Sequence, residues 1–422
     1  MISAKLDPTI LPKQTGGLKA ERTFHRVTFT PSSAKPGETL YVSVPNLSEG
    51  IVLVPNSLAL RFDLGLQPST ADERYAVNNL GRNVISKLKI KFAGETAIDL
   101  SRPDLYYTYK DLFLKKEDRA ARIDQGIGGV ILRKVRSPIK TQPTDTAPAT
   151  AVAEAKGIKA AYGTKYTIPF DFEPLTQHGV FYPRVLHSEM QFEITLADAS
   201  NIIQQDGTTA LTGDQTYSMT NLELQYETIQ SDVLAYSADR GYASGKAFLY
   251  EHVNLYKTFA FLDKTDELIT QSINIPRRSL TGLLLLFVKP HGLGLRDSEA
   301  FVNPNITQVG INVNGMPNKV FSQGIRAGDI YNEVVRRFGN EVTPGDFYQK
   351  KYALWVDLRA TNDNTIHGGG LKLVNTQDGV VLEIKRTKDS AADAAAKINC
   401  YIFVVADAQM SIEQNQLKSI AY

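Results

Sequence analysis

Cysteine is almost absent from this chain, whose 422 residues include a single one, Cys400. One cysteine permits neither an intrachain disulfide nor a cysteine-based zinc site, which suits folding in a reducing compartment. Because Cys400 lies in the strand-like run 398–406, we interpret it as a small buried hydrophobe. Long apolar runs are also missing. The longest, Leu283–Val288, is too short to span a bilayer, and residues 1–20 have no signal-peptide core, so we expect folding in the cytosol.

No excess of either charge is present. The chain carries 47 basic and 45 acidic residues, a formal net charge of +2. A protein that coats nucleic acid needs a clustered basic surface, so we expect no specific nucleic-acid partner. Histidines are few and none are spaced by four residues, as a pair of metal ligands on a helix would be, so we expect no metal and no cofactor. The six are His25, His178, His187, His252, His291 and His367.

A pattern of short strands fills the sequence instead, and it occurs twice. Each half consists of apolar-alternating runs separated by Gly, Pro, Asn and Asp turns, with one principal helix and one long polar loop. The halves meet at Ser231–Lys246, which has helical or linker character. Two sheets of four strands bury such alternating faces. We therefore predict an all-β fold with a few helices, made of two tandem eight-stranded jelly-roll β-sandwiches.

This prediction divides the chain into three ranges. Residues 1–22 contain two prolines and a Gly-Gly pair with little periodicity, and we interpret them as an N-terminal arm. Residues 23–240 form the first jelly roll, with a long exposed loop at 141–163 that is rich in Ala, Thr and Pro. Residues 241–422 form the second jelly roll.

The same patterns predict the secondary structure. One helix begins at Ser101, whose hydroxyl suits an N-cap with Asp104 three residues later, and it continues to Ile123. A second helix runs from Asp329 to Arg337. The predicted strands are 24–30, 40–45, 58–66, 84–92, 166–172, 190–196, 219–229, 248–262, 268–275, 280–288, 309–313, 352–358, 380–385, 398–405 and 410–412.

Several motifs resemble parts of catalytic sites but are incomplete. His367–Gly370 is similar to the oxyanion loop of esterases, which also requires a Gly-x-Ser-x-Gly elbow. In Gly241–Gly245 the serine, Ser244, stands one position too late. That segment also resembles the end of a phosphate-binding loop, but Ala247 replaces the required Ser or Thr. Gly126–Gly129 follows no strand, so it is weak as a dinucleotide loop. We expect no catalytic residues and no enzyme.

Short segments from about residue 50 to the last residue carry a family resemblance through their order and coverage. They are Val54–Leu58, Val77–Asn83, Tyr109–Leu112, His178–Phe181, Leu222–Thr228, Asn274–Arg277, Ser322–Ile325, Ala353–Arg359, Gly379–Ile384 and Asn415–Tyr422. In these segments the sequence resembles the double jelly-roll major capsid proteins of Polinton (Maverick) elements and adintoviruses, in the adenovirus-hexon lineage. The arm and the loop 141–163 lie outside the resemblance.

The resemblance implies a homotrimer that forms a pseudo-hexagonal capsomer and tiles an icosahedral DNA-virus shell. It implies neighbouring trimers, a penton protein and minor capsid proteins as partners, and a place in the virion capsid after synthesis in the host cytosol. Near-neutral charge suits trimers that pack edge to edge. We interpret residues 1–19 as a contact with a neighbouring trimer or the inner face, and the loop 141–163 as an outward tower or trimer cap.

Two other functions are compatible with the residues. A carbohydrate-binding β-sandwich protein would use exposed aromatic side chains and often calcium, and Asn362–Asn364 suggests a calcium loop but lacks a following series of ligands. A hydrolase would depend on the His367 loop alone. Tyr106, Tyr107 and Tyr109 could form a stacking platform, but we interpret them as part of a half-buried helix packed on a sheet.

Overall fold

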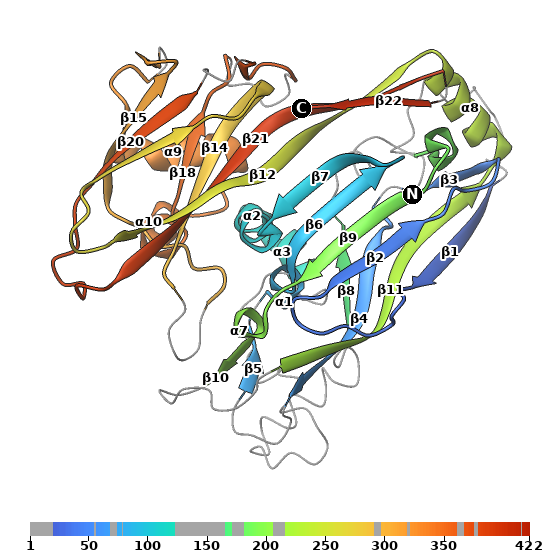
Figure 1. Ribbon diagram of the computed structural model, residues 1–422, viewed down its shortest axis with the longest axis horizontal. Coiled ribbons are helices and arrows are strands. Elements are labelled where there is room, and N and C mark those ends of the chain that lie inside the picture. Colours follow the sequence, from blue (N-terminus) through green and yellow to red (C-terminus); the bar gives the residue numbers. More distant parts are fainter. Residues whose placement is uncertain are drawn as a thin grey trace.

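The computed structural model describes residues 20–54, 56–67, 74–77, 79–122, 165–170, 181–205, 216–290, 297–318, 321–360, 367–374, 379–414 and 416–422. Two β-sandwiches lie beside each other, one built from each half of the chain (Figure 1). Residues 1–19 of the predicted arm, the loop 141–163, His178, His291 and Asn362–Asn364 lie outside the described residues.

The first half is a long antiparallel ribbon rolled into two sheets. Its main strands are β1 (Glu21–Thr28), β2 (Thr39–Val44), β4 (Ala59–Gln67), β6 (Ile85–Phe92), β7 (Glu95–Ser101), β8 (Lys165–Pro169), β9 (Met190–Leu196) and β11 (Thr216–Gln230). In chain order the first strand pairs with the last and the pairs nest inward: β1 with β11, β2 with β9, β4 with β8 and β6 with β7. The sheets have the orders β1-β11-β4-β8 and β2-β9-β6-β7. This nested pairing makes a jelly roll.

The second half repeats that topology. Its main strands are β12 (Lys246–Leu262), β13 (Leu268–Ile273), β14 (Arg277–Val288), β15 (Ile306–Val313), β16 (Met316–Pro317), β18 (Ala353–Asp357), β20 (Val380–Arg386) and β21 (Lys397–Glu413). Their orders, β12-β21-β14-β18 and β13-β20-β15-β16, have the same nested ranks as those of the first half. The two halves therefore have the same strand topology although their sequences differ.

Shorter elements complete the described part of the chain. The strands are β3 (Ile51–Leu53), β5 (Arg74–Ala76), β10 (Ile203–Gln205), β17 (Ile325–Arg326), β19 (Leu371–Leu373) and β22 (Gln416–Ala421). The helices are α1 (Leu80–Asn83), α2 (Pro103–Asp111), α3 (Lys116–Arg122), η2 (Pro183–Leu186), α7 (Ala199–Ile202), α8 (Asp232–Ala243), α9 (Ala327–Phe338) and α10 (Pro344–Lys350).

Alternation decides which face each strand buries. Along β9, Met190, Phe192 and Ile194 are buried and the residues between them are more exposed. The longest apolar run, Leu283–Val288, belongs to β14, a central strand on which both faces are covered. Gly282 on β14 is required by close packing, because an added Cβ would lie 2.4 Å from the Trp355 ring.

The predicted fold class is confirmed, and the segment 231–246 does contain a helix, α8. As a domain boundary, the division between residues 240 and 241 stays a prediction, and it falls inside α8. The strands β7 and β22 were not predicted, and β21 is one continuous strand where two were expected. The backbone hydrogen bonds of β21 continue along its whole length although the surroundings of its side chains change. A prediction from the local side-chain pattern does not reveal that continuity.

The predicted helix from Ser101 to Ile123 is wrong in its start and in its continuity. Ser101 ends β7, and the N-cap of α2 is Arg102, with left-handed backbone and no side-chain cap. Asp104 instead accepts hydrogen bonds from the Arg102 guanidinium, the shortest at 2.8 Å. Residues 112–115 then separate α2 from α3. Tertiary pairing of β7 with β6 outweighs the local capping signal at Ser101.

Candidate functional site: the junction of the two sandwiches

The helix α2 joins the two sandwiches through its aromatic side chains. Tyr106 lies 5.8 Å from the Phe403 ring of β21, and Tyr109 lies 5.2 Å from Phe301 and 5.5 Å from Phe338, measured between ring centroids. Tyr106 and Tyr109 are buried. The interpretation of these tyrosines as a packed helix is confirmed, and what the helix packs against is the other half of the chain.

A buried charge reinforces this junction. The Tyr106 hydroxyl donates to Oε1 of Glu251 on β12 at 2.6 Å, and the Arg337 guanidinium of α9 donates to the other carboxylate oxygen. Burial, the largest single influence, would raise the pKa of Glu251, but the charges of Arg337 and Lys110 and the hydrogen bonds from Tyr106 and Arg337 together outweigh it, and the pKa is lowered. Burial, together with Glu251, raises the pKa of Tyr106 well above its ordinary value. The site therefore holds a carboxylate, a guanidinium and a neutral phenol at neutral pH.

Three further contacts cross between the halves. Arg102 lies over the Tyr401 ring at 5.1 Å, and Arg119 of α3 pairs with Glu299. The Tyr250 hydroxyl of β12 donates to the backbone oxygen of Ala97 at 3.1 Å. Together with α2, these contacts fix the two sandwiches as one unit, because shifting either would uncover buried charge.

The strand β22 adds a strap on the same side. It pairs with β21 of the second sandwich and lies against β7 and η2 of the first, and Figure 1 shows it running along the long β12–β21 ribbon. Just after it, the Tyr422 ring stacks on His252 with ring centroids 4.2 Å apart and an angle of 7°. The Arg277 guanidinium lies over the same Tyr422 ring, 5.0 Å from its centroid. Burial and Arg277 lower the pKa of His252 to about 4, so this imidazole is neutral.

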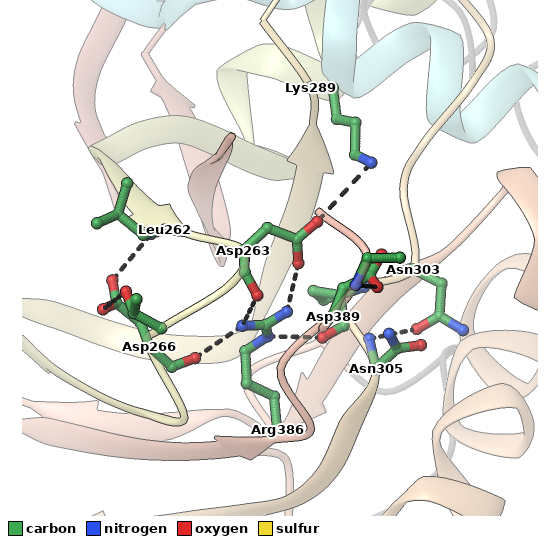
Figure 2. A network of polar contacts seen from close by, with 11 residues as sticks. Leu262, Asp263, Asp266, Lys289, Asn303, Asn305, Arg386 and Asp389 are labelled. Carbon is green, nitrogen blue, oxygen red and sulfur yellow. Dashed lines mark hydrogen bonds and ion pairs between the residues drawn. The ribbon is translucent and has the colours of Figure 1, made fainter. Parts of the chain in front are cut away.

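A second buried arginine organises loops at one end of the second sandwich. Arg386 donates to the backbone oxygens of Pro304 at 2.8 Å and of Asp266 at 2.7 Å, and to both a backbone and a carboxylate oxygen of Asp263. Figure 2 shows the guanidinium between these loops. Lys289 approaches the same carboxylate at 3.8 Å. Arg386 was not predicted as a site residue because the predicted strand ended at residue 385, although position 386 continues the buried face of Val380, Leu382 and Ile384.

The structure uses the His367 loop for anchoring. Gly368 N–H donates to Asp407 Oδ2 at 2.7 Å, and Gly370 N–H donates to Ser279 Oγ at 2.9 Å. The Ser279 hydroxyl donates in turn to Asp407 at 2.6 Å, while His367 Nδ1 lies 3.6 Å from the other Asp407 oxygen. A hydrolase would need a serine hydroxyl that is hydrogen-bonded to the histidine, and glycine N–H groups that are free to bind the oxyanion. Here the carboxylate separates serine from histidine, and the amides are occupied.

The remaining candidate residues have structural partners. Ser244 Oγ donates to the Gly241 backbone oxygen at 3.0 Å, at the end of α8. His25 stacks on Tyr226 with ring centroids 4.9 Å apart. Cys400 is buried, and burial raises the pKa of its thiol. Within the described ranges, no group of His, Cys, Asp and Glu has the arrangement of a metal site.

A hollow of about 550 Å³ opens at the end of the first sandwich between η2 and α8. Its lining includes Asp232, Asp239 and Tyr236, and Tyr236 is 67% exposed. Arg184 at its rim pairs with Glu49 at 2.8 Å. The hollow therefore places an exposed aromatic ring beside two carboxylates.

The nested strand orders in both halves decide the architecture. The chain has the double jelly-roll fold. No protein-family model matches the sequence, and no curated protein matches it. Among the described residues no helix is both long and apolar enough to cross a membrane.

Solved structures with this double jelly roll include three from viruses. The capsid protein in the quasi-atomic model of the PBCV-1 virus capsid is 11% identical, with 97% of this chain and 99% of that chain covered and a TM-score of 0.61. The Faustovirus major capsid protein is 9% identical, with 97% of this chain and 94% of that chain covered and a TM-score of 0.60. A chain of the Sputnik virophage is 11% identical, with 99% of this chain and 92% of that chain covered and a TM-score of 0.58. The TM-scores and the coverage show a shared fold along nearly the whole length.

Proposed function

We propose that this protein is a major capsid protein whose homotrimers form pseudo-hexagonal capsomers of an icosahedral DNA-virus shell. The observation that carries the proposal is the double jelly roll itself, matched end to end in structures described as virus capsid proteins. Three chains with two similar sandwiches each present six similar lobes, and this is the geometry of a pseudo-hexagon. The Polinton and adintovirus lineage is consistent with this proposal.

The junction supports the same role. A pseudo-hexagonal tile requires the two sandwiches of one chain to keep a fixed angle, and the contacts of α2, Glu251 and Arg337 supply that rigidity. A structural role needs no catalytic residues, and we propose that the chain is not an enzyme. Penton and minor capsid proteins, and neighbouring trimers, are the partners that such a capsomer would contact in the virion.

The first test is the solution mass of the purified chain by light scattering, followed by negative-stain imaging of the same peak. We expect a mass of three chains of 46.6 kDa and a hexagonal outline. Particles that stay monomeric at capsid-like concentrations, with no lattice on addition of crowding agent, would contradict the proposal.

Carbohydrate binding is the second candidate function, and the hollow beside Tyr236 is the observation that favours it. A glycan array separates it from the capsid function. Binding that the Tyr236→Ala variant weakens by about fivefold or more would support a sugar site, because a stacked aromatic ring contributes on the order of 1 kcal/mol. The matched control is Tyr41→Ala, which removes an equally exposed tyrosine on β2.

A further inference from the structure

The strand β1 leaves one edge of the first sandwich open. Among the described strands it pairs with β11 alone (Figure 1). In continuation of that register, Phe29 N–H donates to the Leu222 oxygen, so odd-numbered residues of β1 direct their backbone groups toward β11. The even-numbered residues Arg22, Phe24 and Arg26 direct theirs outward. Such an edge is a template for one more strand.

Apolar surface is uncovered at the same place. A hollow of about 370 Å³ lies between β1 and β2, and its lining includes Val27, Tyr41 and Val42. Tyr41 is 65% exposed. A strand that added to β1 would satisfy the backbone groups, and an apolar face on it would fill this hollow.

The sequence just before β1 contains a segment with that character. From Lys5 to Lys13 the residues alternate, and one face is entirely apolar: Leu6, Pro8, Ile10 and Pro12. The other face is mostly polar. Between this segment and β1 stands Gly16-Gly17, a pair that suits the positive φ angles of a two-residue hairpin turn.

A turn at Gly16-Gly17 fixes the register of the pairing. Thr15 and Leu18 become the first hydrogen-bonded pair. Hydrogen-bonded pairs then recur at every second residue, which on β1 are residues 22, 24 and 26. These are the residues whose backbone groups point outward. The two prolines, which lack an N–H, fall opposite Glu21 and His25 at positions that make no ladder hydrogen bond.

The side chains agree with this register. Leu6 is placed opposite Val27, on the face that borders the hollow, and Ile10 is placed opposite Thr23 on the same face. On the outer face Asp7 is placed opposite Arg26, which gives a cross-strand pair of opposite charge. Turn, prolines, apolar face and charges all select one register.

We propose that residues 5–13 fold back at Gly16-Gly17 and add to the open edge of β1 in this register. The occupant is the segment of the same chain, because so short a connection gives it an effective concentration in the millimolar range. The inference is independent of the capsid function, since it concerns a single chain. It also assigns this segment to its own sandwich, where the sequence analysis placed it on a neighbour or the inner face.

Engineered cysteines in the full chain test the register. Ile10 and Thr23 form a pair without ladder hydrogen bonds, whose Cα atoms at about 4.5 Å suit a disulfide. Leu11→Cys with Thr23→Cys is the matched control, because residue 11 faces the other side. Cys400 is buried and does not compete. After mild oxidation we expect the Ile10→Cys/Thr23→Cys chain to close its disulfide at least about tenfold more completely than the control.

Equal yields in the two variants would overturn the proposal. So would a disulfide between chains when Ile10→Cys and Thr23→Cys are made on separate chains and mixed, because a second copy would then supply the strand. Hydrogen exchange on the unmodified protein is the second measurement. We expect slowed exchange at the amides of Arg22 and Phe24, and exchange at the rate of a free peptide there would also overturn the pairing. Light scattering on the same samples reports separately on the trimer.

Discussion

Single buried side chains decide how firmly the loops of this protein are held, and Arg386 is the clearest case. Its side chain is fully buried and satisfies backbone oxygens of two loops and the Asp263 carboxylate (Figure 2). We predict that Arg386→Lys lowers the free energy of unfolding by about 3 kcal/mol, because a single ammonium cannot replace a fork of five donors and leaves Asp263 underpaired. Urea denaturation followed by intrinsic fluorescence measures this.

Lys388→Ala is the matched control. Lys388 lies two residues away, and its ion pair with Glu267 is exposed on both sides, at 52% and 59%. Its removal should change the unfolding free energy by no more than about 0.5 kcal/mol. If Arg386→Lys costs as little as this control, the guanidinium does not hold the loops.

Among the secondary-structure elements, β22 is held by a contact that we expect to weaken in acid, the packing of Tyr422 on His252. His252, which receives the Tyr422 ring, has its pKa lowered to about 4 by burial and by Arg277, although Asp99 acts in the opposite sense. In the unfolded chain the imidazole has an ordinary pKa of about 6.5 and takes up its proton more readily. The stability present above pH 6.5 is therefore lost as the pH falls from about 6.5 to about 4, by about 3 kcal/mol.

The measurement is the unfolding free energy of the wild type and of His252→Gln across this pH range. The variant should lose this part of the pH dependence, and Tyr422→Ala should weaken the strap at every pH. Carboxylates that titrate in the same range contribute equally to both proteins and cancel in the difference. Parallel curves for wild type and His252→Gln would show that β22 is not coupled to this proton.

For the chain as one body, the junction predicts that both sandwiches unfold together. Tyr106, Glu251 and Arg337 link α2, β12 and α9 across the halves. We predict a single cooperative transition in calorimetry for the wild type. Glu251→Ala removes the carboxylate that Arg337 and Tyr106 share, which costs about 3–5 kcal/mol, and it should separate the trace into two transitions.

Glu223→Ala serves as the control for this experiment. Glu223 pairs with Arg61 within the first sandwich, at 3.2 Å, and takes no part in the junction. Its variant should lower the melting temperature yet keep one transition. Two transitions in the wild type would mean that the sandwiches are independent and that the junction does not fix their angle.

Much of this architecture was visible in the sequence. Alternation along segments such as 84–92 and 190–196 marks the strands, because a strand that buries one face must alternate wherever it pairs. The repeat of that pattern and the helix between the halves predicted two sandwiches. Residues 95–101 were missed because their signal competes with a capping signal at Ser101, which pairing with β6 overrides.

The junction was beyond such local signals. In the sequence, Glu251 is one polar position on an alternating strand and Tyr106 is one aromatic residue on a helix, and neither pattern indicates that the two are in contact. They are 145 residues apart, and Glu251 and Arg337 are 86 apart. The strand class and its repetition were fixed by the chain, because they depend on the faces of individual segments. Which charges become buried, and that β1 has β11 as its one partner among the described strands, depends on how those segments pack, because burial is a property of neighbours that the folded chain brings together.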